Sequence, residues 1–136
     1  MDFTKSHALM APESAPLHVL IIEDDAALAY ALARYLTSQK MRVTVAEAGL
    51  AGIEADEHDP CDLLLLDLRL PDIAGSDVAR DLKQRRPNVP VLVMTGNPGD
   101  LMANWPTAVL VKPFEPADLH DRIRQICPAS QPAALH

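Results

Sequence analysis

Residues 63–71 read LLLLDLRLP: four leucines, an aspartate, and a proline four residues further on. An apolar run this short between polar breakers is typical of a strand that is buried on both faces of a parallel sheet. Asp67 then lies where this strand gives way to a loop. Because a buried carboxylate is costly unless another group pairs with it, we expect the rest of the chain to supply partners for Asp67.

Four further segments have the pattern of strands, and helical patterns alternate with them. Strands are expected at 19–22, 42–46, 89–94 and 108–111, and helices at 26–38, 47–57, 76–86 and 116–127. Ser76 is expected to cap the third helix, and Leu50 and Ile53 are expected to face the core. This alternation predicts an α/β fold, a (βα)5 three-layer sandwich with helices on both sides of a parallel sheet.

The composition is typical of one domain with an acidic balance. The chain has 136 residues, a hydrophobic fraction of 49% and a formal net charge of −7, which argues against a general nucleic-acid surface. No apolar run approaches the roughly 20 residues of a membrane span, and Cys61 and Cys127 are too few for a disulfide framework. We expect a cytoplasmic protein without a membrane partner, with its domain at 17–127 and flexible tails at 1–16 and 128–136.

Polar and charged residues follow the predicted strands at the ends where parallel sheets bind ligands. They are Glu23, Asp24 and Asp25 after the first strand, Asp67 after the third, Thr95 after the fourth and Lys112 after the fifth. Parallel strands place these ends at one edge of the sheet, so we expect acids, a hydroxyl and an ammonium in one crevice. A set of helix caps is the alternative. It remains open for Asp25 but does not account for the whole set.

Carboxylates in such a crevice repel one another. At about 4 Å a like-charged pair costs about 4 kcal/mol in an effective dielectric of about 20, and a divalent cation relieves this repulsion. Oxygen ligands without His or Cys favour a hard ion such as Mg²⁺, bound in the millimolar range, roughly −4 kcal/mol. Asp67 is then predicted to be a nucleophile toward a phosphoryl group, with Lys112 and the Thr95 hydroxyl holding the phosphoryl oxygens.

Four motifs along the chain closely resemble the receiver domain of two-component response regulators. They are the apolar run into residues 23–25, the segment 67–71 with Gly75, residues 93–96 (VMTG) and residues 111–114 (VKPF). Each motif is weak alone, but four in this order and spacing make a strong resemblance, which covers about residues 17–127. It implies a flavodoxin-like fold with a five-stranded sheet of order 2-1-3-4-5.

The same resemblance implies roles for individual residues around the metal. Asp67 corresponds to the aspartate that is phosphorylated. Glu23 and Asp24 correspond to the acidic pair that binds Mg²⁺ together with Asp67. The backbone carbonyl of Arg69 is implied as a further ligand of that ion.

Other implied roles concern the phosphoryl group and its donor. Thr95, Gly96 and Lys112 correspond to the residues that contact the phosphoryl group and switch the domain. The peptide bond between Lys112 and Pro113 is expected to be cis. The implied donor is a histidine kinase or a histidine phosphotransfer protein, and the implied output is phosphorylation-dependent partner binding or phosphorelay.

Two features depart from the usual receiver pattern. Val109 stands three residues before the lysine, where receivers usually carry Tyr or Phe. Pro98 and Pro106 bracket a segment that leaves room for about one helical turn, so the fourth helix is expected to be short. We therefore predict that residues 96–107 become ordered on phosphorylation and that Trp105 faces a partner.

Three functions compete on this sequence. The favoured one is a stand-alone receiver, since residues 128–136 are too few for a DNA-binding module, with no enzymatic activity beyond its own phosphorylation and dephosphorylation. An Mg²⁺-dependent phosphatase would want an acid two residues after Asp67, where Arg69 stands, and a cap over its substrate. A pseudo-receiver would bind partners without phosphorylation, which the complete set of acids, threonine and lysine disfavours.

Overall fold

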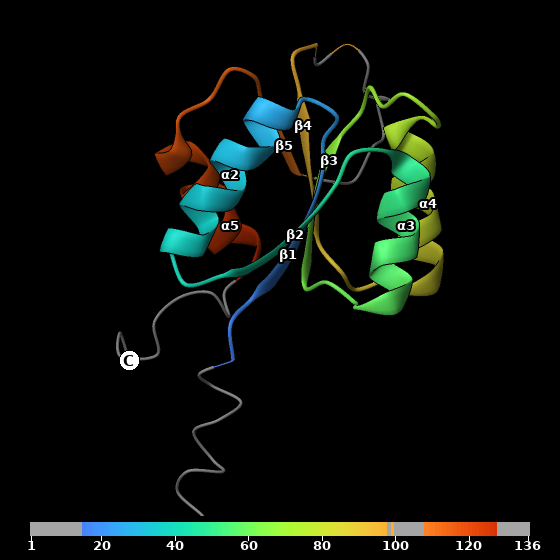
Figure 1. Ribbon diagram of the computed structural model, residues 1–136, viewed down its shortest axis with the longest axis horizontal. Helices are drawn as coiled ribbons and strands as arrows, with labels where there is room; N and C mark the ends of the chain where they lie inside the picture. Colours follow the sequence, from blue (N-terminus) through green and yellow to red (C-terminus); the bar gives the residue numbers. More distant parts are fainter. Residues whose placement is uncertain (1–14, 98, 100–107, 128–136) are drawn as a thin grey trace, which may run out of the picture.

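A parallel five-stranded sheet of order β2-β1-β3-β4-β5 forms the centre of the protein (Figure 1). The structure, a computed structural model, describes residues 15–97, 99 and 108–127. Its strands are β1 (His18–Ile22), β2 (Arg42–Ala46), β3 (Leu63–Asp67), β4 (Val91–Thr95) and β5 (Ala108–Val111). Its helices are α2 (Ala26–Ser38), α3 (Gly49–His58), α4 (Gly75–Arg85) and α5 (Pro116–Ile126). The predicted fold class and strand order are confirmed.

The leucine run forms β3, the central strand. All residues of β1, β3 and β4 are buried, because helices cover both faces of the sheet: α2 and α5 lie on one side, and α3 and α4 on the other (Figure 1). Successive strand side chains point to opposite faces. Leu65 accordingly packs in one core cluster with Leu36 and Leu119, while Leu64 packs in the other with Leu82.

The start of α4 differs from its prediction. The helix begins at Gly75 with Ala74 at the N-cap position, and Ser76 lies inside its first turn. The prediction that Ser76 caps the helix is therefore wrong. The helix begins earlier because Gly75 docks directly on the end of β3: its N–H donates to the carbonyl of Leu68 at 3.0 Å.

Helix α3 also begins differently from its prediction. It begins at Gly49 rather than residue 47, which places Leu50 in the first turn with 58% of its surface exposed. The prediction that Leu50 faces the core is wrong, whereas Ile53 does pack against the core. The predicted fourth helix and Trp105 fall within residues 100–107 and lie outside the described residues.

The carboxyl ends of the strands are held together by backbone bonds just beyond the strands. Glu23 N–H donates to the carbonyl of Ala46 at 3.0 Å, and Lys112 N–H donates to the carbonyl of Thr95 at 2.8 Å. These bonds continue the ladders of β1 with β2 and of β4 with β5 by one residue. Among the helices that the structure describes, none has the length and apolar character needed to cross a bilayer.

Candidate functional site

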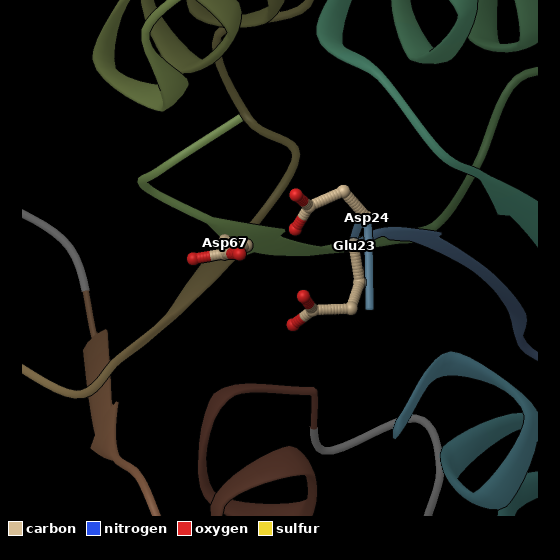
Figure 2. Close-up of side chains that lie close together, drawn as sticks. All are labelled: Glu23, Asp24 and Asp67. Atoms are coloured by element: carbon tan, nitrogen blue, oxygen red, sulfur yellow. The ribbon is translucent and has the colours of Figure 1, made fainter. Parts of the chain in front are cut away.

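Three carboxylates meet at the carboxyl edge of the sheet (Figure 2). Glu23 directly follows β1, and Asp67 ends β3. Because Ile22 lies opposite Leu66 in the pairing of these strands, the two carboxylates come to neighbouring positions. One oxygen from each of Glu23, Asp24 and Asp67 can be chosen so that all three lie within 4.8 Å of one another. Glu23 and Asp67 are buried while Asp24 is exposed, so solvent reaches the cluster from the side of Asp24.

Lys112 brings the positive charge of this site. Its Nζ lies 2.8 Å from Glu23 Oε1 and 3.6 Å from Asp67 Oδ2. Lys112 directly follows β5, the edge strand, so its side chain reaches past the end of β4 to contact both acids. The peptide bond between Lys112 and Pro113 is cis. One ammonium therefore faces two carboxylates, with a third close by.

The surroundings of Glu23 disfavour its charge. Burial raises the pKa of the Glu23 carboxyl above its usual value, and the charge of Asp67 adds to the rise. The hydrogen bond from Lys112 and the N–H of Asp25, which donates to Glu23 Oε2 at 3.1 Å, act in the opposite direction. A cation bound beside these carboxylates would relieve the same repulsion. Every candidate side-chain ligand in the cluster is an oxygen, and this donor set fits a hard ion such as Mg²⁺.

Thr95 and Gly96 lie at the end of β4. Thr95 is 2% exposed, and its hydroxyl takes part in a tight turn: Oγ1 donates to the carbonyl of Asn97 at 3.2 Å and accepts from the N–H of Asn97 at 3.0 Å. Gly96 is exposed. In this structure the Thr95 hydroxyl is therefore engaged by its own loop, and a group bound at Asp67 would have to compete with Asn97 for it.

The loop after β3 folds back on Asp67. The N–H of Arg69 donates to Asp67 Oδ1 at 3.2 Å, so the backbone at Arg69 is held beside the carboxylate. Gly75 closes the loop from the other side. A Cβ added at Gly75 would lie 2.5 Å from the carbonyl oxygen of Asp67 and 2.6 Å from Leu68 Cα. Glycine is therefore required at this position by the close approach of α4 to the end of β3.

Comparison with known proteins places this geometry in a family. The model of the response regulator receiver domain matches residues 19–124. The chain belongs to the receiver domain family. Its receiver domain is 31% identical over 115 residues to the cell cycle transcriptional regulator CtrA of Caulobacter vibrioides, a match that covers 81% of this chain and 50% of that protein. The chain thus spans about half the length of this curated relative.

Solved receiver domains have the same fold. The receiver domain of a sensor histidine kinase from Pseudomonas aeruginosa, with a magnesium ion in its active-site cleft, is 28% identical with a TM-score of 0.74, over 82% of this chain and 97% of that one. A CheY-like receiver domain protein from Methanospirillum hungatei is 24% identical with a TM-score of 0.78, over 85% of this chain and 97% of that one. The latter likeness concerns the fold alone.

Some residues of the receiver site were missed or left open by sequence reasoning. Asp25 proves to be a helix cap, since its Oδ1 accepts the N–H of Leu28 at 3.1 Å. Asp72 was not singled out, yet its carboxylate binds the first N–H groups of α3. No local signal in the sequence pointed to this role, because the N-cap of α3 is Ala48, which has no side-chain acceptor, and the acceptor comes from a distant loop.

Proposed function

We propose that this receiver domain accepts a phosphoryl group on Asp67 from a histidine kinase or a histidine phosphotransfer protein. The observation that carries the proposal is the position of Lys112, whose ammonium lies 2.8 Å from Glu23 and 3.6 Å from Asp67. The ammonium beside the buried carboxylate of Asp67 can offset the negative charge that a phosphoryl group would bring there. The exposure of Asp24 leaves the same edge open to a partner.

The chemistry proposed for Asp67 is a direct displacement. A carboxylate oxygen attacks the phosphorus of the donor phosphohistidine, a P–O bond forms, and the P–N bond breaks. The imidazole leaves with the electron pair of that bond and takes up a proton. Lys112 offsets the charge that the phosphoryl oxygens bring to the edge, and the Thr95 hydroxyl turns from Asn97 to one of those oxygens.

A magnesium ion completes the proposed site. Glu23, Asp24, Asp67 and the backbone carbonyl of Arg69 would hold it, and it would supply positive charge to the phosphoryl oxygens. The oxygen-only donor set favours a hard cation here. The magnesium in the active-site cleft of the Pseudomonas aeruginosa receiver domain supports this assignment.

The proposed output is a phosphorylation-dependent switch or a phosphorelay step in the cytoplasm. Under this proposal the domain catalyses only its own phosphorylation and dephosphorylation. Arg69 favours this over a small-molecule phosphatase, because it stands where such an enzyme would want an acid. The net charge of −7 favours a protein partner over direct nucleic-acid binding.

Labelling with acetyl phosphate tests the proposal. Intact-mass spectrometry of the wild type should show one added phosphoryl group when Mg²⁺ is present and very little when it is chelated. Asp67→Asn should show none. Asp59→Asn makes the same change of charge at the amino ends of the strands, where Asp59 pairs with Arg42 at 2.7 Å. This control variant should be labelled to the same extent as the wild type. Acid-stable labelling of Asp67→Asn to the same extent would contradict the proposal.

A further inference from the structure

Asp72 ties the loop between β3 and α4 to the start of α3. Its Oδ1 accepts the N–H of Gly49 at 2.8 Å, and its Oδ2 accepts the N–H of Leu50 at 2.8 Å. Oδ1 also accepts the N–H of Ile73 at 2.9 Å. A single carboxylate thus joins two elements that lie more than twenty residues apart in the chain.

The start of α3 depends on this carboxylate. The first N–H groups of a helix have no partner within the helix and carry partial positive charge. Ala48, at the N-cap position of α3, has no side-chain oxygen to offer them. The N–H of Leu50, together with those of Gly49 and Ile73, holds the pKa of the Asp72 carboxyl below its usual range, so Asp72 is charged at neutral pH.

Close packing supports the same junction. A Cβ added at Gly49 would lie 2.5 Å from Ile73 Cγ1, so the start of α3 lies directly against the loop. At the loop's far end Gly75 N–H donates to the carbonyl of Leu68. The backbone at Arg69, between these two anchors, is held by its bond to Asp67 Oδ1.

We propose that Asp72 is a positioning residue for the metal site. By pinning the loop to α3, it fixes the backbone carbonyl of Arg69 relative to the carboxylates of Asp24 and Asp67. Asp72 acts through the loop and does not itself contact the ion. The inference rests on the proposed function, because it needs Arg69 to be one of the magnesium ligands.

A comparison of two ions separates the positioning role of Asp72 from two simpler roles, a nearby negative charge and a helix cap. Mg²⁺ requires nearly ideal octahedral geometry with short bonds, whereas Ca²⁺ accepts longer bonds and variable geometry. A loosened loop should therefore weaken Mg²⁺ binding more than Ca²⁺ binding. Loss of a nearby negative charge alone would weaken both divalent ions by the same factor, and loss of a helix cap alone would weaken neither.

The test compares Asp72→Asn and Asp72→Glu with the wild type and with Asp59→Asn as the charge control. Dissociation constants for Mg²⁺ and for Ca²⁺ are measured by amide shifts in the metal-free protein titrated with each ion. Asp72→Glu keeps the charge but lengthens the side chain by one methylene. For both Asp72 variants we expect the Mg²⁺ dissociation constant to rise about 10-fold, as for other residues that orient metal ligands, and the Ca²⁺ constant to rise clearly less.

Amide hydrogen exchange reports the hydrogen bonds of Asp72 to α3 directly. In the metal-free Asp72 variants, the amides of Gly49 and Leu50 should exchange with solvent faster than in the wild type. Equal factors for the two ions, or unchanged constants despite faster exchange, would overturn the positioning role. If Asp72→Asn does not fold, Asp72→Glu decides by the same comparison of the Mg²⁺ and Ca²⁺ dissociation constants. A wild type that binds no Mg²⁺ would overturn the proposed metal site and this inference together, whereas normal Mg²⁺ binding with insensitivity to Asp72 overturns this inference alone.

Discussion

Lys112 Nζ lies 2.8 Å from Glu23 Oε1, although the two residues are 89 positions apart in the chain. The side chain of Glu23 is 1% exposed and that of Lys112 is 24% exposed. The pair joins the ends of β1 and β5, which two other strands separate. The ammonium therefore serves the fold before any phosphoryl group arrives, because it is the partner of a buried carboxylate.

Replacing the ammonium should destabilise the domain in a pH-dependent way. Lys112→Met leaves Glu23 buried without its cation, which should cost on the order of 3 kcal/mol at pH 7. The pKa of Glu23, already raised by burial, should rise further in this variant. The folded state then binds a proton more tightly than the unfolded state, so the deficit should shrink as the pH falls through that pKa. Urea unfolding of the wild type and of Lys112→Met at pH 7 and pH 5 measures this difference in unfolding free energy.

A second substitution provides the control for this prediction. In Glu23→Gln/Lys112→Met the charge of Glu23 is gone along with its ammonium, so most of the lost stability at pH 7 should return, apart from the share that comes from Asp67, whose Oδ2 lies 3.6 Å from Lys112 Nζ in the wild type. Two results would contradict the assignment of this loss of unfolding free energy to the unpaired carboxylate of Glu23. One is a loss in Lys112→Met that is the same at both pH values, and the other is a loss that the double variant does not reduce.

Gly75→Ala should destabilise the protein because the added methyl meets backbone rather than a side chain that could turn away. The nearest atoms are the carbonyl oxygen of Asp67 at 2.5 Å and Leu68 Cα at 2.6 Å. Overpacking of this kind costs between about 1 and 3 kcal/mol, more than the helix propensity of alanine returns at a helix end. Thermal unfolding and the yield of phosphorylated Asp67 should both fall.

Ser76→Ala is the matched control for that variant. Ser76 lies in the first turn of α4 rather than at its N-cap, so its removal should change the free energy of unfolding by less than about 0.5 kcal/mol. A loss of about 1 kcal/mol, as expected for a true N-cap, would instead support Ser76 as the cap.

Asp56→Asn should weaken the packing of α3 against the end of α4. Asp56 is 2% exposed, and its carboxylate accepts Arg86 at 2.6 Å and Arg85 at 3.1 Å. Burial alone would raise its pKa, but the N–H of Cys61 and the two guanidinium groups outweigh burial and hold the pKa below its usual range. Loss of the charge should cost about 3 kcal/mol at pH 7.

The acid limb of the unfolding curve checks this assignment. Because the pKa of Asp56 is lower in the folded than in the unfolded protein, its carboxylate stabilises the fold at pH values above the unfolded-state pKa, which is near 4. This stabilisation is lost as the pH falls through the folded-state pKa. The wild type and Asp56→Asn should therefore converge in stability below about pH 4. Curves that remain parallel down to pH 2 would contradict the assignment.

Sequence reasoning reached the strands because four of them are short apolar runs followed by a polar residue and β2 alternates, although β4 runs from Val91 to Thr95 rather than over the predicted 89–94. Asp67 and Lys112 could be placed at one edge on that ground alone. The strand order came with the family resemblance, since periodicity does not say which strands are neighbours. The roles of Glu23 and Asp24 as the acidic pair came with the same resemblance.

What sequence reasoning did not reach depends on contacts between distant segments. Leu50 has the spacing of a core residue, yet it is exposed because α3 begins at Gly49, where the carboxylate of Asp72 binds its first N–H groups. A cap supplied from another loop leaves no local pattern. Ser76 shows the converse: it has the chemistry of a cap, but the docking of Gly75 on β3 sets the start of the helix.

Mapping the phosphoryl group to a residue tests whether Asp67 is the acceptor. The wild-type protein is labelled with acetyl phosphate and Mg²⁺, reduced with borohydride, which converts an acyl phosphate on aspartate to homoserine, and digested for tandem mass spectrometry. If Asp67 is the acceptor, homoserine appears at position 67, and Asp24, Asp25 and Asp72 remain unchanged. Homoserine at another aspartate with residue 67 intact, or none at any position despite a stable phosphate mass, would contradict it.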